Sequence, residues 1–81
     1  PECFEGLPIS VIFDARPLID SGDTPMPKIL KAMDDLKSGE VFELLTPFYP
    51  APIIDTLRKK GYSSWSKKVA PDIVNTYFMR K

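Results

Sequence analysis

Apolar and polar positions along the chain follow two different periods, and these periods predict its secondary structure. Residues 9–14 (Ile-Ser-Val-Ile-Phe-Asp) are β-branched or apolar at nearly every position, which is typical of a strand covered on both faces or lying in mid-sheet. From Met26 the apolar residues recur three, four, seven and ten positions on, which is the spacing of one helix face. We therefore expect a first helix over residues 25–37, with Thr24 as its N-cap and Ser38-Gly39 ending it.

The second half of the chain repeats the order of strand and helix and then adds two strands. Residues 41–46 form the second predicted strand, and a proline-rich turn leads to a helix from about residue 51 to residue 60, closed by a glycine. Residues 62–69 and 73–80 are rich in strand-forming residues. Ala70-Pro71-Asp72 between them is typical of a hairpin turn.

The resulting order β-α-β-α-β-β defines an α/β (α+β) two-layer sandwich. Because connections between parallel strands cross over right-handed, both helices are expected on one face of a four-stranded mixed sheet. The expected strand order is 1-2-4-3, with strand three antiparallel to the others. Residues 1–8 are interpreted as an extended lead-in and residues 9–81 as a single domain. The chain starts at Pro1 without a methionine, which is typical of a processed chain or an excised module.

Composition restricts the chemistry that the chain can perform. The 81 residues contain no histidine, which removes the usual general base, the usual zinc ligand and the His-assisted nucleophiles. The one cysteine, Cys3, cannot form an internal disulfide, and this favours a reducing, cytoplasmic location. No apolar run approaches the roughly 20 residues that span a bilayer. We therefore expect a protein that is not an enzyme, carries no cofactor or metal, and does not bind a membrane.

The charges are balanced overall but unevenly placed. Residues 1–40 carry four Lys or Arg against eight Asp or Glu, and residues 41–81 carry seven against three. Proteins that bind nucleic acid are usually basic over the whole domain. The zero net charge therefore argues against nucleic acid as a partner.

Two predicted loops leave the carboxyl ends of the first two strands, where ligands of open α/β sheets bind. The first loop carries Asp14 and Arg16 and leads to Thr24, and the second carries Phe48 and Tyr49. Arg16 and the N–H groups at a helix start suit an anion, and the two rings suit an apolar wall. Structural interpretations stay open, in which Asp14 pairs with Arg16, Thr24 only caps the helix and Phe48 belongs to the core.

Three segments resemble the TusA/SirA-like family of small sulfur-carrier domains. They are residues 13–18 (Phe-Asp-Ala-Arg-Pro-Leu), 24–30 (Thr-Pro-Met-Pro-Lys-Ile-Leu) and 36–41 (Leu-Lys-Ser-Gly-Glu-Val). In that family a strand ending in Asp-Ala-Arg precedes a Cys-Pro-x-Pro run that opens the first helix, and Gly-Glu leads into strand two. The resemblance implies a bacterial protein with the same two-layer fold over about residues 9–81.

The residue that carries sulfur in that family is replaced in this chain. The family cysteine holds a persulfide at a helix N-terminus, where the dipole stabilises a thiolate. The matching run here starts with Thr24, whose hydroxyl cannot hold a persulfide. With the proline-rich turn at residues 47–52 and the Gly61-Tyr62 pair, the chain resembles a cysteine-less branch that is uncharacterised.

These features predict a non-catalytic binding or protein-interaction module of the TusA/SirA-like fold. Its expected partner is another protein or a fused domain, or a small anionic ligand. One alternative is sulfur relay through Cys3 or through a partner's cysteine, although Glu2 and Glu5 beside Cys3 favour an inert thiol. A second alternative is RNA binding, because the fold is similar to the C-terminal domain of an initiation factor, but the balanced charge argues against it.

Overall fold

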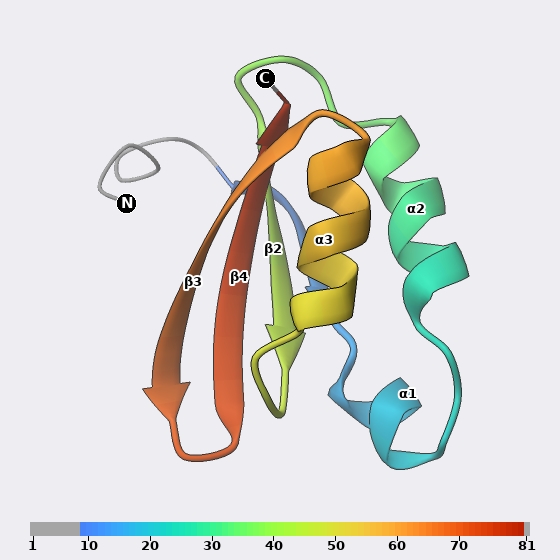
Figure 1. Ribbon diagram of the computed structural model, residues 1–81, viewed down its shortest axis with the longest axis vertical. Coiled ribbons are helices and arrows are strands. Elements are labelled where there is room, and N and C mark those ends of the chain that lie inside the picture. The colour runs from blue at the N-terminus through green and yellow to red at the C-terminus, as the bar shows by residue number, and fades with distance from the viewer. Residues whose placement is uncertain (1–8, 81) are drawn as a thin grey trace.

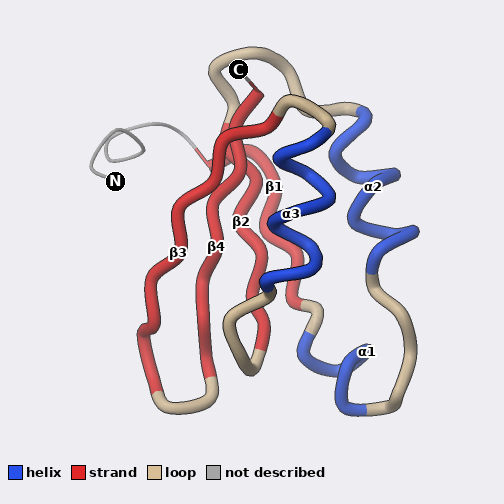
Figure 2. Tube along the Cα trace, in the orientation of Figure 1, coloured by secondary structure: helices blue, strands red, loops and turns tan. Residues whose placement is uncertain are grey.

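The computed structural model describes residues 9–80 and arranges them in two layers, a four-stranded sheet and the helices against one of its faces (Figure 1). The elements in chain order are β1 (Ile9–Asp14), α1 (Arg16–Asp20), α2 (Met26–Asp34), β2 (Val41–Thr46), α3 (Ala51–Lys59), β3 (Tyr62–Ala70) and β4 (Ile73–Arg80). Both long helices lie on the same face of the sheet (Figure 2), which confirms the predicted α+β sandwich. In the described range no helix is long and apolar enough to cross a membrane.

The strands lie in the order β1-β2-β4-β3, as predicted, but their directions differ from the prediction. β2 is parallel to β1 and antiparallel to β4, and β4 is antiparallel to β3. The strand that runs against the others is therefore β4. The physical reason is that α3 carries the chain from the end of β2 back to the start of β3, so β2 and β3 run the same way, and the hairpin then reverses β4. As a result β1, β2 and β3 all end at one edge of the sheet (Figure 1).

The core lies between the helices and the alternating inward positions of the two central strands. In β4 the alternate residues Val74, Thr76 and Phe78 are buried. Phe78 contacts Phe42 of β2, with ring centroids 6.4 Å apart. The helices contribute the buried side chains Ile29, Met33, Ile54 and Leu57.

The prediction that residues 9–14 form a strand covered on both faces or in mid-sheet is wrong. β1 is an edge strand, and Ile9 and Ile12 are 46% and 65% exposed. Ile12 lies opposite Glu43 of β2, on the face that the long helices do not cover. The strand buried along nearly its whole length is β2, which has a neighbour on each side.

The helix boundaries correct three further predictions. The expected loop after β1 contains the short helix α1, because Pro17 has the φ that a first turn needs. Helix α2 begins at Met26 with Pro25 as its N-cap, and Thr24 makes no capping bond. With Thr24 as N-cap, the third helical position would be Pro27, which has no N–H to donate.

The end of α2 also differs from the predicted one, whereas α3 ends at Lys59, one residue before its predicted end. α2 ends at Asp34, because Asp34 and Asp35 place two carboxylates at the negative end of the helix dipole. Gly39, with φ +87°, serves the turn before β2 instead of the helix end. α3 spans Ala51–Lys59, and Gly61 follows it with φ +99°, as the closing glycine should.

Candidate functional site

Three connections gather at the edge where β1, β2 and β3 end, at the bottom of Figure 1. They are the link from β1 into α1, residues 47–50 between β2 and α3, and the turn at residues 71–72 between β3 and β4. Two pockets open there, and Pro47 lines both of them. This edge, called the loop edge below, is where the predicted site was expected.

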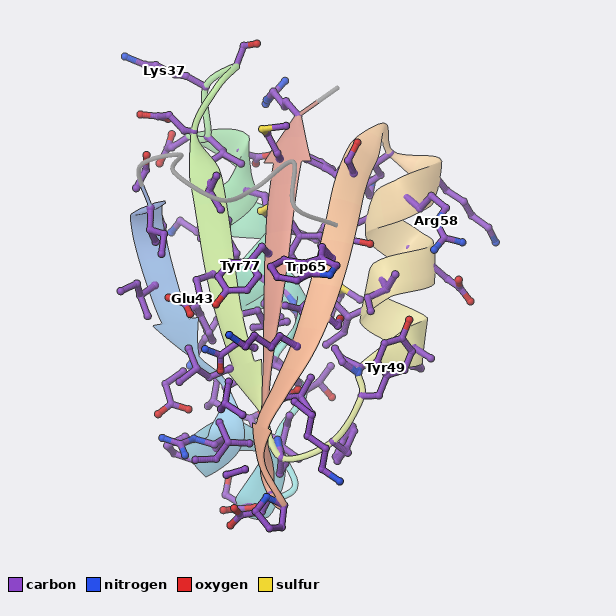
Figure 3. All side chains as sticks on the ribbon, turned by 90° about the vertical axis from the view of Figure 1, so that its left-hand side faces the viewer. Lys37, Glu43, Tyr49, Arg58, Trp65 and Tyr77 are labelled. Carbon is purple, nitrogen blue, oxygen red and sulfur yellow. The ribbon has the colours of Figure 1, made fainter. Side chains whose placement is uncertain are left out.

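The first pocket is mainly apolar and holds both predicted aromatic residues. Its volume is about 380 Å³, and its lining residues are Pro47, Phe48, Tyr49, Ser66, Lys68, Pro71 and Val74. Phe48 and Tyr49 are 53% and 58% exposed, and Tyr49 projects from the loop before α3 (Figure 3). The interpretation of Phe48 as a core residue is therefore wrong. Among the lining residues within the range 9–80, Lys68 is the only charged one.

Local hydrogen bonds hold the loop that carries the two rings. The buried Thr46 hydroxyl donates to the Phe48 carbonyl at 2.5 Å, and the Ala51 N–H donates to the Tyr49 carbonyl at 3.0 Å. The pyrrolidine rings of Pro47 and Pro50 fix the φ angles at the two ends of the loop, and Pro50 is buried. The backbone is therefore preorganised, so a ligand that contacts the rings has little loop motion to restrict.

The second pocket contains the predicted pair of Asp14 and Arg16. Its volume is about 510 Å³, and it is lined by Asp14, Arg16, Pro17, Asp20, Pro47 and Asp72. The Arg16 Nε donates to Asp14 Oδ1 at 2.9 Å, and Arg16 Nη2 donates to Asp14 Oδ2 at 2.7 Å. The Arg16 backbone N–H also donates to Asp14 Oδ1 at 3.1 Å, so Asp14 serves the first turn of α1. The predicted pairing is confirmed.

The charges of this pocket are predominantly negative. The Arg16 guanidinium, mainly through its hydrogen bonds, holds the pKa of Asp14 below its ordinary value of 3.8. The hydrogen bond to Asp14 raises the pKa of Arg16, and the nearby carboxylates of Asp72 and Asp20 act in the same direction. The described lining therefore holds three carboxylates and one guanidinium, a balance of −2. An anion at Arg16 would have to displace Asp14 and face the other two carboxylates, whereas a cation would meet unpaired negative charge.

Thr24 is separate from this arrangement. It is exposed and lies between α1 and α2, and its backbone N–H donates to Asp23 Oδ1 at 2.8 Å. It lines neither of the two pockets. The five candidate residues therefore divide into an ion pair in one pocket, two aromatic rings in the other, and Thr24 outside both.

The profile of a family described as "Uncharacterized conserved protein (DUF2249)" matches residues 12–77, which is most of the chain. The chain belongs to this family. No curated protein and no solved structure matches it. The DUF2249 range contains every residue that lines the two pockets. The loop edge is thus built from the DUF2249 domain itself.

Sequence reasoning missed what the hairpin contributes to the pockets of this DUF2249 domain. Ser66, Lys68 and Pro71 line the apolar pocket, and Asp72 lines the acidic one. The predicted direction of strand three placed the hairpin at the opposite edge of the sheet. The crossover through α3 was the signal that could have corrected this, because it requires β3 to run parallel to β2.

The face of the sheet opposite the long helices carries a second polar cluster (Figure 3). The buried Glu43 accepts a hydrogen bond from Asn75 Nδ2 at 2.8 Å, and Tyr77 stacks on Trp65 with ring centroids 5.6 Å apart. Burial raises the pKa of the Tyr77 hydroxyl. The hydrogen bond with Asn75 lowers this pKa, and the Glu43 carboxylate raises it. These residues come from three neighbouring strands and tie them together. Within residues 9–80 no cluster of side chains suits a metal ion, and Cys3 lies outside the described residues.

Proposed function

We propose that the chain is a non-catalytic protein-interaction module of the TusA/SirA-like fold and that the loop edge is its binding surface. The observation that carries this proposal is the pair of exposed rings, Phe48 and Tyr49, beside an open apolar pocket. Aromatic residues are enriched at protein interfaces, where they bury a large area with few rotatable bonds. The rings lie on a loop that prolines and hydrogen bonds already hold, which lowers the entropic cost of binding.

The titratable groups of the loop edge support a binding role over catalysis. Asp14 and Arg16 satisfy each other in a bidentate pair. A general base near neutral pH needs a pKa close to the operating pH, and the pKa of Asp14 is shifted away from it. The element order and the replacement of the carrier cysteine by Thr24 support a TusA/SirA-like module that does not carry sulfur itself.

Site-specific photo-crosslinking in the source cells tests this proposal. A photoreactive phenylalanine analogue is placed at position 49, and the matched control carries it at position 58 on α3, where the Arg58 side chain is 62% exposed. We expect one defined protein to be crosslinked from position 49 and not from position 58. The same protein should bind the purified wild-type chain and not the Phe48→Ser/Tyr49→Ser variant. Equal crosslinking from both positions, or crosslinking from position 58 alone, would contradict the assigned surface.

A further inference from the structure

The two pockets of the loop edge adjoin at Pro47, which lines both. The rings of Phe48 and Tyr49 line one of them, and the carboxylates of Asp20 and Asp72 line the other. Side chains two positions apart in an extended peptide point the same way and are separated by roughly 6.5–7 Å. An extended segment can therefore place one side chain in each of two adjoining pockets.

The charges determine which side chain belongs in which pocket. Asp20 and Asp72 are exposed, and within the described range neither forms an ion pair, because Arg16 binds Asp14. A Lys or Arg side chain entering the acidic pocket would meet these two carboxylates. In the apolar pocket the same side chain would meet Lys68, which repels it. Charge complementarity thus assigns the cation to the acidic pocket and the apolar group to the aromatic one.

The backbone form of the ligand follows from the lining as well. Rigid surfaces of prolines and exposed aromatic rings suit extended or polyproline II segments, which need little ordering on binding. Pro47 and Pro71 line the apolar pocket together with Phe48 and Tyr49. We propose, resting on the function proposed above, that the partner presents an extended peptide segment in which an apolar side chain fills the Phe48–Tyr49 pocket and a neighbouring Lys or Arg enters the Asp20–Asp72 pocket.

Selection from a library of random, displayed nine-residue peptides tests the inference. We expect the wild-type chain to enrich peptides with an apolar residue followed or preceded, within three positions, by Lys or Arg. The Asp20→Asn/Asp72→Asn variant should retain the apolar position and lose the basic one. The Asp34→Asn/Asp35→Asn variant has the same change in net charge at the end of α2, away from both pockets, and should enrich the same peptides as the wild type.

Titration of one enriched peptide supplies the magnitudes. Asp20→Asn/Asp72→Asn should weaken binding roughly 5- to 30-fold at low salt, with a smaller effect at high salt because the surface charges are screened. Lys68→Ala, within the apolar pocket, should leave the affinity unchanged or raise it, because it removes a charge that repels the basic residue. Phe48→Ser/Tyr49→Ser should abolish detectable binding.

The possible failures separate this inference from the function on which it rests. The enriched peptides could share an apolar position but no basic one, both with the wild type and with the Asp20→Asn/Asp72→Asn variant. This result would overturn the inference and leave the interaction surface in place. If no peptide is enriched but a protein is crosslinked from position 49, the inference is also overturned and the interaction surface stays, because the partner would then not present a linear segment. Enrichment that survives Phe48→Ser/Tyr49→Ser would overturn both proposals. Dimerisation of the wild-type chain, lost in Asp20→Asn/Asp72→Asn, would replace the peptide by a second copy of the chain.

Discussion

Single residues differ in how far their roles follow from the sequence alone. The pairing of Asp14 with Arg16 could be predicted, because two opposite charges two positions apart at the end of a strand can meet without help from the rest of the fold. The exposure of Phe48 could not, because an aromatic ring in a short loop can turn into the core or out of it, and the path of residues 47–50 between β2 and α3 decides which. A charge pair that the backbone brings together locally is therefore predictable, whereas the side that an apolar loop residue takes depends on the whole fold.

The Asp14–Arg16 pair leads to a prediction on pH dependence. The folded-state pKa of Asp14 lies below its ordinary value of 3.8, so its contribution to stability is present above that pH and is lost as the pH falls through the folded-state value. Because the Asp14 side chain is 39% exposed, solvent screening limits the contribution to about 1 kcal/mol or less. Asp14→Asn should lower the unfolding free energy by that amount at pH 7. Urea unfolding of the wild type and of Asp14→Asn, measured from pH 7 to pH 2, should show the difference between their unfolding free energies shrinking towards zero. A difference that grows on acidification would contradict this account.

Secondary structure elements were predicted well in their centres and less well at some ends. The strands at residues 9–14, 41–46 and 73–80 match in full, because apolar, aromatic or β-branched residues fill most of their positions. The start of α2 was wrong because the prediction treated Thr24 as a generic cap and ignored that Pro27 has no N–H. An element end depends on which hydrogen bonds the flanking residues can make, and this needs more than the apolar period.

The end of α3 offers a direct test of a predicted boundary. Gly61 has φ +99°, and a Cβ at this position would meet no heavy atom within 4 Å. Gly61→Ala should therefore destabilise the fold by about 1–2 kcal/mol through backbone conformation alone. Gly61→Asn should cost less, because asparagine tolerates the left-handed region better. Lys60→Ala, at the neighbouring position with φ −88°, is the control. In thermal unfolding, Gly61→Ala should be the least stable of the three variants, Gly61→Asn the next and Lys60→Ala the most stable.

At the scale of the whole molecule, the strand order could be predicted and the strand directions could not be inferred from periodicity. A period of two residues is the same in both directions, so only the connections reveal how each strand runs. The final strand is then held by long-range contacts. Arg80 Nε donates to the Leu36 carbonyl at 2.8 Å, and its guanidinium lies 5.6 Å from the centre of the Tyr62 ring. These contacts join β4 to the segment after α2 and to β3, and they depend on the direction of β4.

Sulfur transfer is a property that has to be tested on the whole chain, including Cys3. Incubation with a cysteine desulfurase and cysteine should leave the wild-type protein without a bound sulfur atom, as measured by intact mass. Residues 9–80 contain no cysteine, and Glu2 and Glu5 disfavour the thiolate of Cys3 that would accept sulfur.

Two variants make the result of this experiment decisive. Thr24→Cys places an exposed thiol before α2, at the position that the resemblance to the TusA/SirA-like family matches to the carrier cysteine, and shows whether the desulfurase can reach this chain when a thiol is there. We do not expect the dipole of α2 to activate this thiol, because α2 starts two residues later and its N-cap is Pro25. Cys3→Ser should behave like the wild type. A sulfur atom held at high occupancy by the wild type and lost in Cys3→Ser would make the chain a carrier that acts through Cys3, and the non-catalytic interaction module would then be the wrong description of it.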